Sequence, residues 1–289
     1  MVESVGTAPG APDGAPRRAA VLGLPVRHSL SPTLHHAAYA ALGLRGWQYE
    51  RMECGEKQLP ALVDGLGPEW VGLSLTMPLK RVAMEVAEEV SPLAAAVGAA
   101  NTLLLDGARR ADNTDVLGIS EALREAGVVH ADHPLVLGAG GTAQAALAAL
   151  AQLGATTPTV IVRDLTRTRE LRDTAEHLGI RPVIVGGLFE DPLPEADVVI
   201  STLPTSAADP LASTPWHGCP VVLDVDYANW PTPFATSALK AGCTIVSGLG
   251  VLLHQAVGQV RLMTGLPAPI EAMREALDAE AGVTSAPQR

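Results

Sequence analysis

The chain has 289 residues, of which 47% are hydrophobic and 3% aromatic, and its formal net charge is −11. This length allows two domains, and the dominance of small aliphatic residues favours parallel α/β layers over an antiparallel sandwich. The acidic balance argues against a nucleic-acid partner. Three cysteines without a Cys-x-x-Cys pair argue against a disulfide framework and a zinc site. No long apolar run and no signal-peptide core occur, so we expect a cytoplasmic protein without a membrane partner.

The first part of the chain predicts alternating strands and helices. Residues 1–16 and 281–289 are small or polar segments that we expect to be flexible tails. Apolar runs predict strands over 19–23 and 49–52 and helices over 33–42 and 57–66. Between the first strand and helix, Ser29 and Ser31 lie two residues apart in a turn before Pro32. Two such hydroxyls can point into one cleft, although this pattern more often caps the following helix.

The segment from Ser74 to Lys80 follows a buried strand predicted over 70–73. Thr76 precedes Pro78 as a helix N-cap would, and apolar residues at helical spacing predict a helix to about Val90. Lys80 would then lie in the first turn, where the helix dipole disfavours its charge by roughly 0.3–1 kcal/mol. Such a lysine is suited to proton transfer, whereas the segment by itself is also typical of a solvated surface lysine.

A second polar segment surrounds Asn101, which begins a strand predicted over 101–105 and followed by the hairpin-type turn Asp106-Gly107. Asp115 then precedes apolar residues at helical spacing. We expect Asp115 at or near the N-terminus of that helix, where the dipole favours an ionised carboxylate. Taken alone, this position is also that of an ordinary capping aspartate.

The middle of the chain carries a glycine-rich turn between a strand predicted over 133–137 and a helix predicted over 142–153. The turn reads Gly-x-Gly-x-x-Ala, and a strand over 159–162 follows the helix. This is the context of a dinucleotide fingerprint, in which a pyrophosphate rests on the helix N-terminus. The predicted cofactor-binding residues here are Gly138, Gly140, Gly141, Thr142 and Ala143.

Further elements complete a predicted doubly wound sheet: a helix over 167–178 and strands over 182–185, 196–201 and 220–225. Thr202 and Leu203 follow one of these strands at its carboxyl end, where such folds bind ligands. A strand and turn over 242–248, a helix that carries Gln255, and a helix over 271–281 close the chain.

His28, His35 and His36 lack the acidic partners of a metal site, so we predict no metal and expect solvated or cleft-lining histidines.

Four separated motifs resemble those of the shikimate dehydrogenase family. They are HSLSP at 28–32, SLTMPLK at 74–80, AANT at 99–102 with NTD at 113–115, and GLG to HQA at 248–256. The glycine-rich turn lies between them in family order, and the resemblance spans about 21–265. It implies an α/β fold with a substrate-binding domain at 17–118 and 247–280, and an inserted NAD(P)-binding Rossmann domain at 119–246.

The resemblance also implies NADP-linked, reversible reduction of 3-dehydroshikimate to shikimate, with Lys80 and Asp115 as the catalytic pair. Hydride transfer to a ketone leaves negative charge on oxygen, so an acid must supply a proton there, and no metal is needed. The substrate contacts implied by the resemblance are Ser29, Ser31, Ser74, Thr76, Asn101, Tyr227 and Gln255.

Two positions depart from the family pattern. Ser74 stands where many members have asparagine, and its hydroxyl reaches less far toward a substrate. Asp164 stands about where members often have an arginine that pairs with the 2′-phosphate of NADP, and an acidic residue there favours NAD. Because three arginines, Arg163, Arg167 and Arg169, surround this single aspartate and can bind phosphate, we favour NADP. The resemblance adds Arg163, Asp164, Arg167 and Gly248 to the cofactor-binding residues.

Alternative readings remain open at this point. An NAD-linked quinate/shikimate dehydrogenase or an aminoshikimate-pathway relative would share these motifs. A non-catalytic, nucleotide-binding regulator would share the fold, but the presence of Lys80 and Asp115 disfavours it. A folate-linked dehydrogenase of similar design is disfavoured by Ser29 and Ser31 and by the NTD motif at 113–115. The sequence does not distinguish a monomer from a homodimer.

Overall fold

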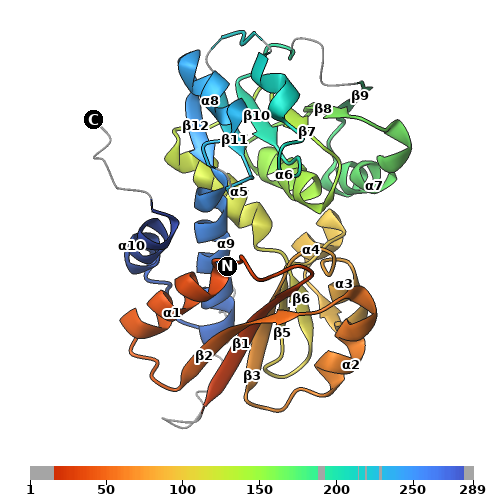
Figure 1. Cartoon of the computed structure of the whole chain (residues 1–289). Helices are drawn as coiled ribbons and strands as arrows, with labels where there is room; N and C mark the ends of the chain where they lie inside the picture. The colour runs from red at the N-terminus through yellow and green to blue at the C-terminus, as the bar shows by residue number, and fades with distance from the viewer. Residues whose placement is uncertain (1–15, 188–192, 214, 219, 228–229, 283–289) are drawn as a thin grey trace, which may run out of the picture. The chain divides into compact units, whose positions relative to one another are not determined.

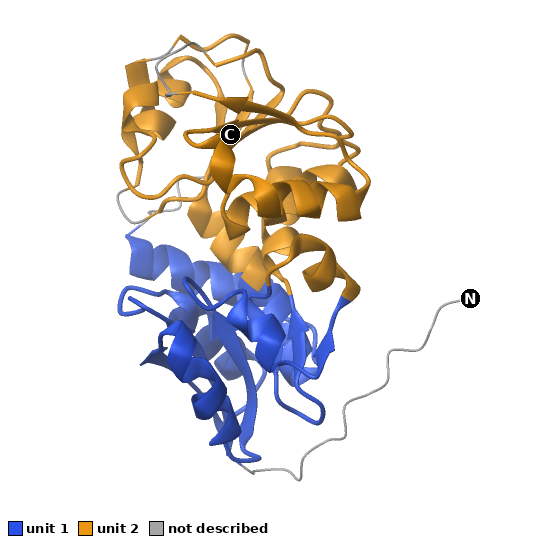
Figure 2. Ribbon diagram, turned by 90° about the vertical axis from the view of Figure 1, so that its right-hand side faces the viewer, with its two compact units in different colours: residues 1–91, 100–112, 256–289 blue, residues 92–99, 113–255 orange. Residues whose placement is uncertain are grey.

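The computed structural model describes residues 16–187, 193–213, 215–218, 220–227 and 230–282. It divides into two compact units (Figure 2). Unit 1 contains residues 1–91, 100–112 and 256–289, and unit 2 contains residues 92–99 and 113–255. The domain borders expected from the sequence, at 118/119 and 246/247, stay a prediction. The expected tails lie outside the described residues, except for residue 16 and residues 281–282.

Unit 1 is built on a six-stranded mixed sheet with the order β2-β1-β3-β5-β6-β4 (Figure 1). β1 runs parallel to β2 and β3, whereas β5 is antiparallel to β3 and β6, so β5 and β6 form the predicted hairpin. The strands are β1 (Arg17–Gly23), β2 (Trp47–Glu53), β3 (Trp70–Leu75), β4 (Glu89–Val90), β5 (Thr102–Leu104) and β6 (Arg110–Asp112).

Helices α1 and α10 pack together on unit 1, and in Figure 1 they lie to the left of the sheet, with α2 and α3 to its right. Every residue of β3 is buried, as expected for a central strand covered on both faces. A Cβ on Gly72 would lie 3.1 Å from the side chain of Met263, so this glycine lets the second half of α9 pack closely on β3. The helices are α1 (Ser31–Ala41), α2 (Leu59–Asp64), α3 (Val82–Val86), α10 (Ile270–Ala281) and part of α9 (Gly248–Thr264), with a 3₁₀ turn η1 (Glu56–Gln58).

The helix predicted from Pro78 to about Val90 is wrong in its extent. Only α3, five residues long, is helical in this stretch. The backbone N–H groups of Glu88 and Glu89 both donate to the carbonyl of Arg109, and β4 then pairs with β6. This pairing with a distant part of the chain ends the helix, although the apolar spacing continues.

Unit 2 is built on a six-stranded parallel sheet with the order β12-β11-β10-β7-β8-β9. The chain moves outward from β7 in one direction and then from β10 in the other, so the predicted doubly wound sheet is confirmed. The strands are β7 (Leu135–Leu137), β8 (Thr159–Val162), β9 (Val183–Gly186), β10 (Val198–Ser201), β11 (Val221–Asp224) and β12 (Thr244–Ser247).

Alternate residues of these strands enter two separate cores. Val136 and Ile200 pack with the helices α5 and α6, whereas Leu137 and Val199 pack with α8 on the other face. Both faces are therefore covered, which explains the continuous apolar runs in the sequence. The helical elements are α4 (Pro92–Val97), α5 (Asp115–Glu125), α6 (Gly141–Gln152), α7 (Arg169–Leu178), α8 (Pro233–Lys240), η2 (Leu165–Arg167) and η3 (Asp209–Ser213). Across the described ranges, no helix has the length and apolarity needed to cross a membrane.

Candidate active site

Lys80 lies in a turn between β3 and α3, and its side chain is half-buried. The turn is held by a bond from the Leu79 N–H to the carbonyl of Thr76, at 2.8 Å. The carbonyl of Lys80 accepts from the N–H of Ala100 at 2.7 Å, which ties this turn to the segment before Asn101. Lys80 therefore precedes a short helix instead of lying in the first turn of a long one, so its predicted position against the helix dipole is wrong.

Thr76, also half-buried, follows directly from β3, and its N–H donates to the carbonyl of Leu22 at 2.9 Å. The ends of β1 and β3 thus place Thr76 beside the turn that leads to Ser29 and Ser31.

Ser29 and Ser31 contact each other through their side chains. The hydroxyl of Ser29 donates to that of Ser31 at 3.2 Å and accepts from the N–H of Ser31 at 3.3 Å. The N-cap of α1 is Leu30, and no side chain caps this helix. The two hydroxyls therefore form a pair. Neither of them is the N-cap of α1.

Asn101 is 2% exposed and is fixed on both sides by the sheet. Its carbonyl accepts from Leu75 N–H at 2.7 Å, and its own N–H donates to the carbonyl of Asp112 at 3.1 Å. The hydroxyl of Thr102 donates to Asn101 Oδ1 at 2.9 Å. The oxygen end of this amide is thus directed at Thr102.

A buried polar cluster lies behind these residues and was not predicted from the sequence. Ser74 accepts from the hydroxyl of Tyr49 at 2.6 Å and donates to Gln259 Oε1 at 2.7 Å. The ring of His35 stacks on Tyr49, with 3.9 Å between centroids and 16° between planes. Burial lowers the pKa of His35 to about 3, so the ring is neutral. The expectation that His35 is solvated or cleft-lining is wrong, whereas His28 and His36 are exposed.

Asp115 is the first residue of α5 in unit 2, as predicted. Asn113 holds it there, because Asn113 Oδ1 accepts from the N–H of Asp115 at 3.0 Å and from that of Val116 at 3.4 Å. The amide nitrogen of Asn113 donates to the carbonyl of Ala99 at 2.8 Å. The half-buried carboxyl group of Asp115 therefore projects from a helix terminus with a fixed backbone.

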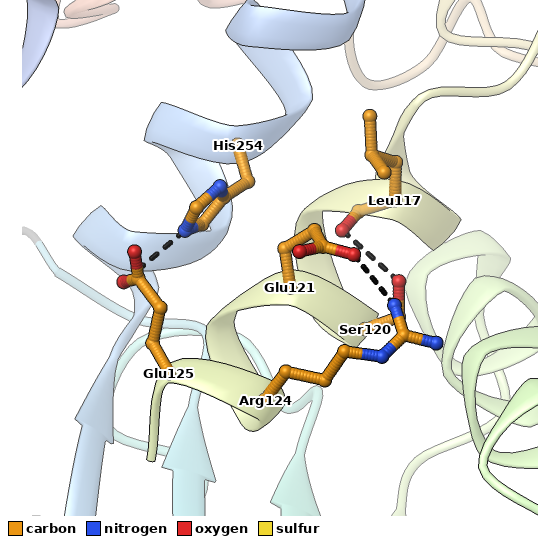
Figure 3. A network of polar contacts seen from close by, with 6 residues as sticks. All are labelled: Leu117, Ser120, Glu121, Arg124, Glu125 and His254. Carbon is orange, nitrogen blue, oxygen red and sulfur yellow. Dashed lines mark hydrogen bonds and ion pairs between the residues drawn. The ribbon is translucent and has the colours of Figure 1, made fainter. Parts of the chain in front are cut away.

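Gln255 is held close to α5 by a tight helix crossing. A Cβ on Gly118 would lie 2.7 Å from the carbonyl of Val251 and 3.1 Å from Cβ of Gln255, so only glycine fits there. Gln255 Nε2 donates to the carbonyl of Leu252 at 2.9 Å. Figure 3 shows that the preceding residue, His254 of α9, points at Glu125 of α5. The distance from His254 Nε2 to Glu125 Oε2 is 3.2 Å.

The glycine-rich turn joins β7 to α6 at the position that a dinucleotide requires. Gly138 has φ +112°, and a Cβ there would lie 2.5 Å from Oγ1 of Thr202. Gly140 is the N-cap of α6 and has no protein atom within 4 Å of a built Cβ. No side chain caps α6, so the N–H groups of its first turn suit a pyrophosphate. Ala143 is fully buried against the sheet.

Gly141 and Thr142 are the first two residues of α6, directly after the N-cap Gly140.

Thr202 and Leu203 follow β10, the strand beside β7, as predicted. Thr202 Oγ1 donates to the carbonyl of Leu137 at 2.8 Å, which fixes this loop against the end of β7. Gly248 opens α9, where a Cβ would collide with the backbone of Val225. A glycine is therefore required at position 248 by packing within the protein. Tyr227 lies half-buried after β11, and burial raises the pKa of its hydroxyl.

The turn after β8 carries exposed charges of both signs. Asp164 Oδ1 accepts from the N–H of Thr166 at 2.9 Å and from its hydroxyl at 2.6 Å, so the carboxylate caps the turn η2. The hydrogen bond from the Thr166 side chain is the main reason that the pKa of Asp164 is lowered. Arg163 and Arg167 flank this carboxylate and are exposed. The turn thus presents two guanidinium groups around an acid that is engaged by Thr166.

Two family models match the chain. Residues 21–103 match the shikimate dehydrogenase substrate binding domain, and residues 248–277 match the shikimate 5'-dehydrogenase C-terminal domain.

Individual relatives match over most of their length. A protein of Methanothermobacter thermautotrophicus named shikimate dehydrogenase (NADP(+)) is 35% identical, over 89% of this chain and 94% of its own. The crystal structure of Mycobacterium tuberculosis shikimate dehydrogenase is similar, with 47% identity, a TM-score of 0.82, and coverage of 91% of this chain and 100% of that one. The Thermus thermophilus enzyme in complex with NADP(H) and shikimate is 32% identical, with a TM-score of 0.79 and coverage of 92% and 99%. The chain belongs to the shikimate dehydrogenase family.

Proposed function

We propose that this protein is a shikimate dehydrogenase that catalyses the reversible, NADP-linked reduction of 3-dehydroshikimate to shikimate. The observation that carries the proposal is near full-length similarity to relatives of that name, one of which is a structure with NADP(H) and shikimate. The glycine-rich turn of unit 2 and the polar cluster of unit 1 support it. The cytoplasmic location and the domain borders stay predictions from the sequence.

The residues of unit 1 suit a small hydroxylated acid. Ser29 and Ser31 offer paired hydroxyls for a carboxylate, and Asn101 offers an amide for a ring hydroxyl. Thr76 and, from unit 2, Gln255 and Tyr227 complete the substrate contacts that the resemblance implies. Small, fixed polar groups of this kind define orientation and specificity in ligand sites.

Proton transfer is assigned to Lys80. When bound, NADPH supplies the hydride, and Lys80 donates a proton to the oxygen that gains negative charge. In the oxidation of shikimate the neutral amine takes this proton back. The resemblance pairs Asp115 with Lys80, and a carboxylate in that role would stabilise the ammonium form of the lysine.

The residues of unit 2 fit NADP. Gly138 lets the turn pack against Thr202, and Gly140 leaves room at the N-terminus of α6 for a pyrophosphate, with Gly141, Thr142 and Ala143 in the first turn of the helix. Arg163 and Arg167 would hold the 2′-phosphate, and Asp164 is engaged by Thr166.

A panel of initial rates tests this proposal directly, with shikimate and quinate each assayed against NADP⁺ and NAD⁺. We expect the highest kcat/KM for shikimate with NADP⁺. Turnover of neither acid with either cofactor would overturn the proposal, and NADP binding without turnover would identify a non-catalytic regulator.

An NAD-linked quinate/shikimate dehydrogenase is the second candidate, because Asp164 stands at the end of β8, where a carboxylate accepts from the ribose hydroxyl of NAD. Replacing Arg163 and Arg167 by alanine distinguishes the NADP-linked from the NAD-linked enzyme. For an NADP enzyme, KM for NADP⁺ rises roughly tenfold or more and KM for NAD⁺ does not. Arg181→Ala, at an exposed arginine elsewhere in unit 2, is the control. Equal effects on both cofactors would favour the second candidate.

A further inference from the structure

A chain of hydrogen bonds runs through unit 1, and its direction can be assigned from one amide. Gln259 Nε2 lies 3.2 Å from the backbone carbonyl of Asn101, which can only accept. The nitrogen end of the Gln259 side chain must therefore face Asn101. Its Oε1 then faces the hydroxyl of Ser74 at 2.7 Å, so Ser74 donates to Gln259.

The same reasoning orders the bonds on the far side of Ser74. Because the Ser74 proton is directed to Gln259, the 2.6 Å bond between Tyr49 and Ser74 must be donated by Tyr49. Burial raises the pKa of Tyr49, and the neighbouring Ser31 hydroxyl counteracts this rise; since the Tyr49 proton goes to Ser74, the Tyr49 oxygen is left to accept from Ser31. Ser31 in turn accepts from Ser29. The path thus ends at Ser29, whose hydroxyl donates only to Ser31 and can turn toward the substrate carboxylate without breaking the rest of the path.

The other end of the path reaches Asn101. Gln259 Nε2 also donates to the hydroxyl of Thr102 at 3.2 Å, and Thr102 donates to Asn101 Oδ1 at 2.9 Å. Gln259 therefore fixes both the backbone carbonyl and, through Thr102, the side-chain amide of Asn101. Because Oδ1 of Asn101 accepts from Thr102, its Nδ2 is the donor end of the amide that the proposed ring contact would use.

We propose that Tyr49, Ser74 and Gln259 are positioning residues, which hold the hydroxyls that bind the substrate carboxylate and the amide that binds its ring at one fixed spacing. This inference rests on the proposed function. It gives Ser74 an indirect role: the serine acts on the substrate through Gln259 and Asn101, and its proton is used within the protein.

Burial makes this arrangement sensitive to the loss of any member. Tyr49, Ser74 and Gln259 are each at most 3% exposed. In such surroundings hydrogen bonds are strengthened, and a partner left without its bond is destabilised. When one hydroxyl is removed, the remaining groups therefore reorient to find new partners. This changes the position of Ser31 or Asn101.

A side branch of the same cluster provides a matched control. The Tyr39 hydroxyl lies 3.3 Å from Nδ1 of His35, and Nε2 of His35 lies 3.3 Å from Gln259 Oε1. Since Oε1 can only accept, the neutral His35 donates through Nε2 and accepts from Tyr39. Tyr39 is thus a buried tyrosine with a hydrogen-bonded hydroxyl, but it does not lie between Ser31 and Asn101.

The test compares Tyr49→Phe and Gln259→Met with Tyr39→Phe. Tyr49→Phe removes one hydroxyl and keeps the ring that stacks on His35. We expect KM for shikimate to rise roughly 3- to 10-fold in Tyr49→Phe and Gln259→Met, the effect of one misplaced hydrogen bond, with KM for NADP⁺ unchanged. Tyr39→Phe should lower Tm to a similar extent and leave both KM values unchanged.

A double variant shows whether Tyr49 acts through Ser31. If it does, Tyr49→Phe has less effect in a Ser31→Ala background than in the wild type. Equal changes of KM in Tyr49→Phe and Tyr39→Phe, or a fall in Tm of Tyr49→Phe without a change in KM, would overturn the positioning role. A wild-type enzyme that does not oxidise shikimate would instead overturn the proposed function, so the two failures are distinguishable.

Discussion

The two units prepare their ligand sites by different physical means. In unit 1, the polar side chains Tyr49, Ser74 and Gln259 are buried and joined to one another by hydrogen bonds. In unit 2, the glycine-rich turn offers backbone N–H groups, and the charged residues after β8 are exposed. A site for a small hydroxylated acid needs side chains at fixed spacing, whereas a pyrophosphate needs mainly open space before a helix N-terminus.

This difference predicts that changes in unit 1 affect the substrate and changes in unit 2 affect the cofactor. The most severe change is Lys80→Ala. We expect kcat to fall roughly 10²- to 10⁴-fold, the range for lost general acid–base catalysis, while shikimate and NADP⁺ still bind. Steady-state kinetics and equilibrium titrations measure the two effects. Lys57→Ala, at an exposed lysine of unit 1, should retain normal turnover, and normal turnover in Lys80→Ala would refute the catalytic role.

The next largest effect is the pH dependence of stability caused by His35. Its pKa is lowered by burial from 6.5 to about 3, so the folded protein holds the neutral form. Neutral, buried His35 therefore costs the folded protein nothing in relative stability above pH 6.5, and the free energy of unfolding decreases as the pH falls from 6.5 toward 3. Between pH 7 and pH 5 we expect the free energy of unfolding to fall by about 2 kcal/mol, at about 1.4 kcal/mol per pH unit.

Urea unfolding at the two pH values measures this loss. In His35→Gln the pH-dependent part should largely disappear, whereas His36→Gln, at an exposed neighbour, should retain it. An unchanged pH dependence in His35→Gln would show that another group is responsible.

Gly140→Ala tests the open space in unit 2. The added Cβ meets no protein atom within 4 Å, so it costs at most about 1 kcal/mol of stability, the typical effect at an N-cap. It occupies the approach of the pyrophosphate, and we expect Kd for NADP⁺ to rise at least about tenfold, equal to ~1.4 kcal/mol. Fluorescence titration gives Kd. Gly187→Ala, also with open space around it, is the control, and a raised KM for shikimate alone would contradict the division between the units.

The smallest expected effect concerns Thr166. Its hydroxyl engages Asp164, so Thr166→Ala releases part of that carboxylate toward a ribose hydroxyl. The ratio of kcat/KM for NADP⁺ to that for NAD⁺ should fall by about 2- to 5-fold, within the range of one hydrogen bond. Thr157→Ala, at an exposed threonine of unit 2, should leave the ratio unchanged, and so would Thr166→Ala if Asp164 has no part in cofactor choice.

The fold of unit 2 could be predicted from the sequence because its signals are local. The apolar run before Gly138, the glycine spacing and the helix after it lie within a short stretch, and the central strands β7, β10 and β11 are covered on both faces. In unit 1, by contrast, the extent of α3 is decided by the bonds of Glu88 and Glu89 to Arg109, which no local spacing reveals.

The candidate site shows the same limit. Lys80, Asn101 and Asp115 were identified from motifs, but the role of Gln259 depends on residues separated from it by 185 and 158 positions. A glutamine within an apolar helix is a signal that a buried polar partner exists. Only the folded chain shows that the partners are Ser74 and Asn101.

The buried hydrogen-bond path of Tyr49, Ser74 and Gln259 limits which segments of this chain can be replaced by those of a relative in a chimera. A chimera that imports asparagine at Ser74, the residue many relatives carry, would meet a glutamine and a tyrosine whose hydrogen-bonding ends are already committed. The three positions lie on three separate segments, so a single crossover does not transplant them together. Hybrids should therefore keep substrate affinity only when all three positions come from one parent.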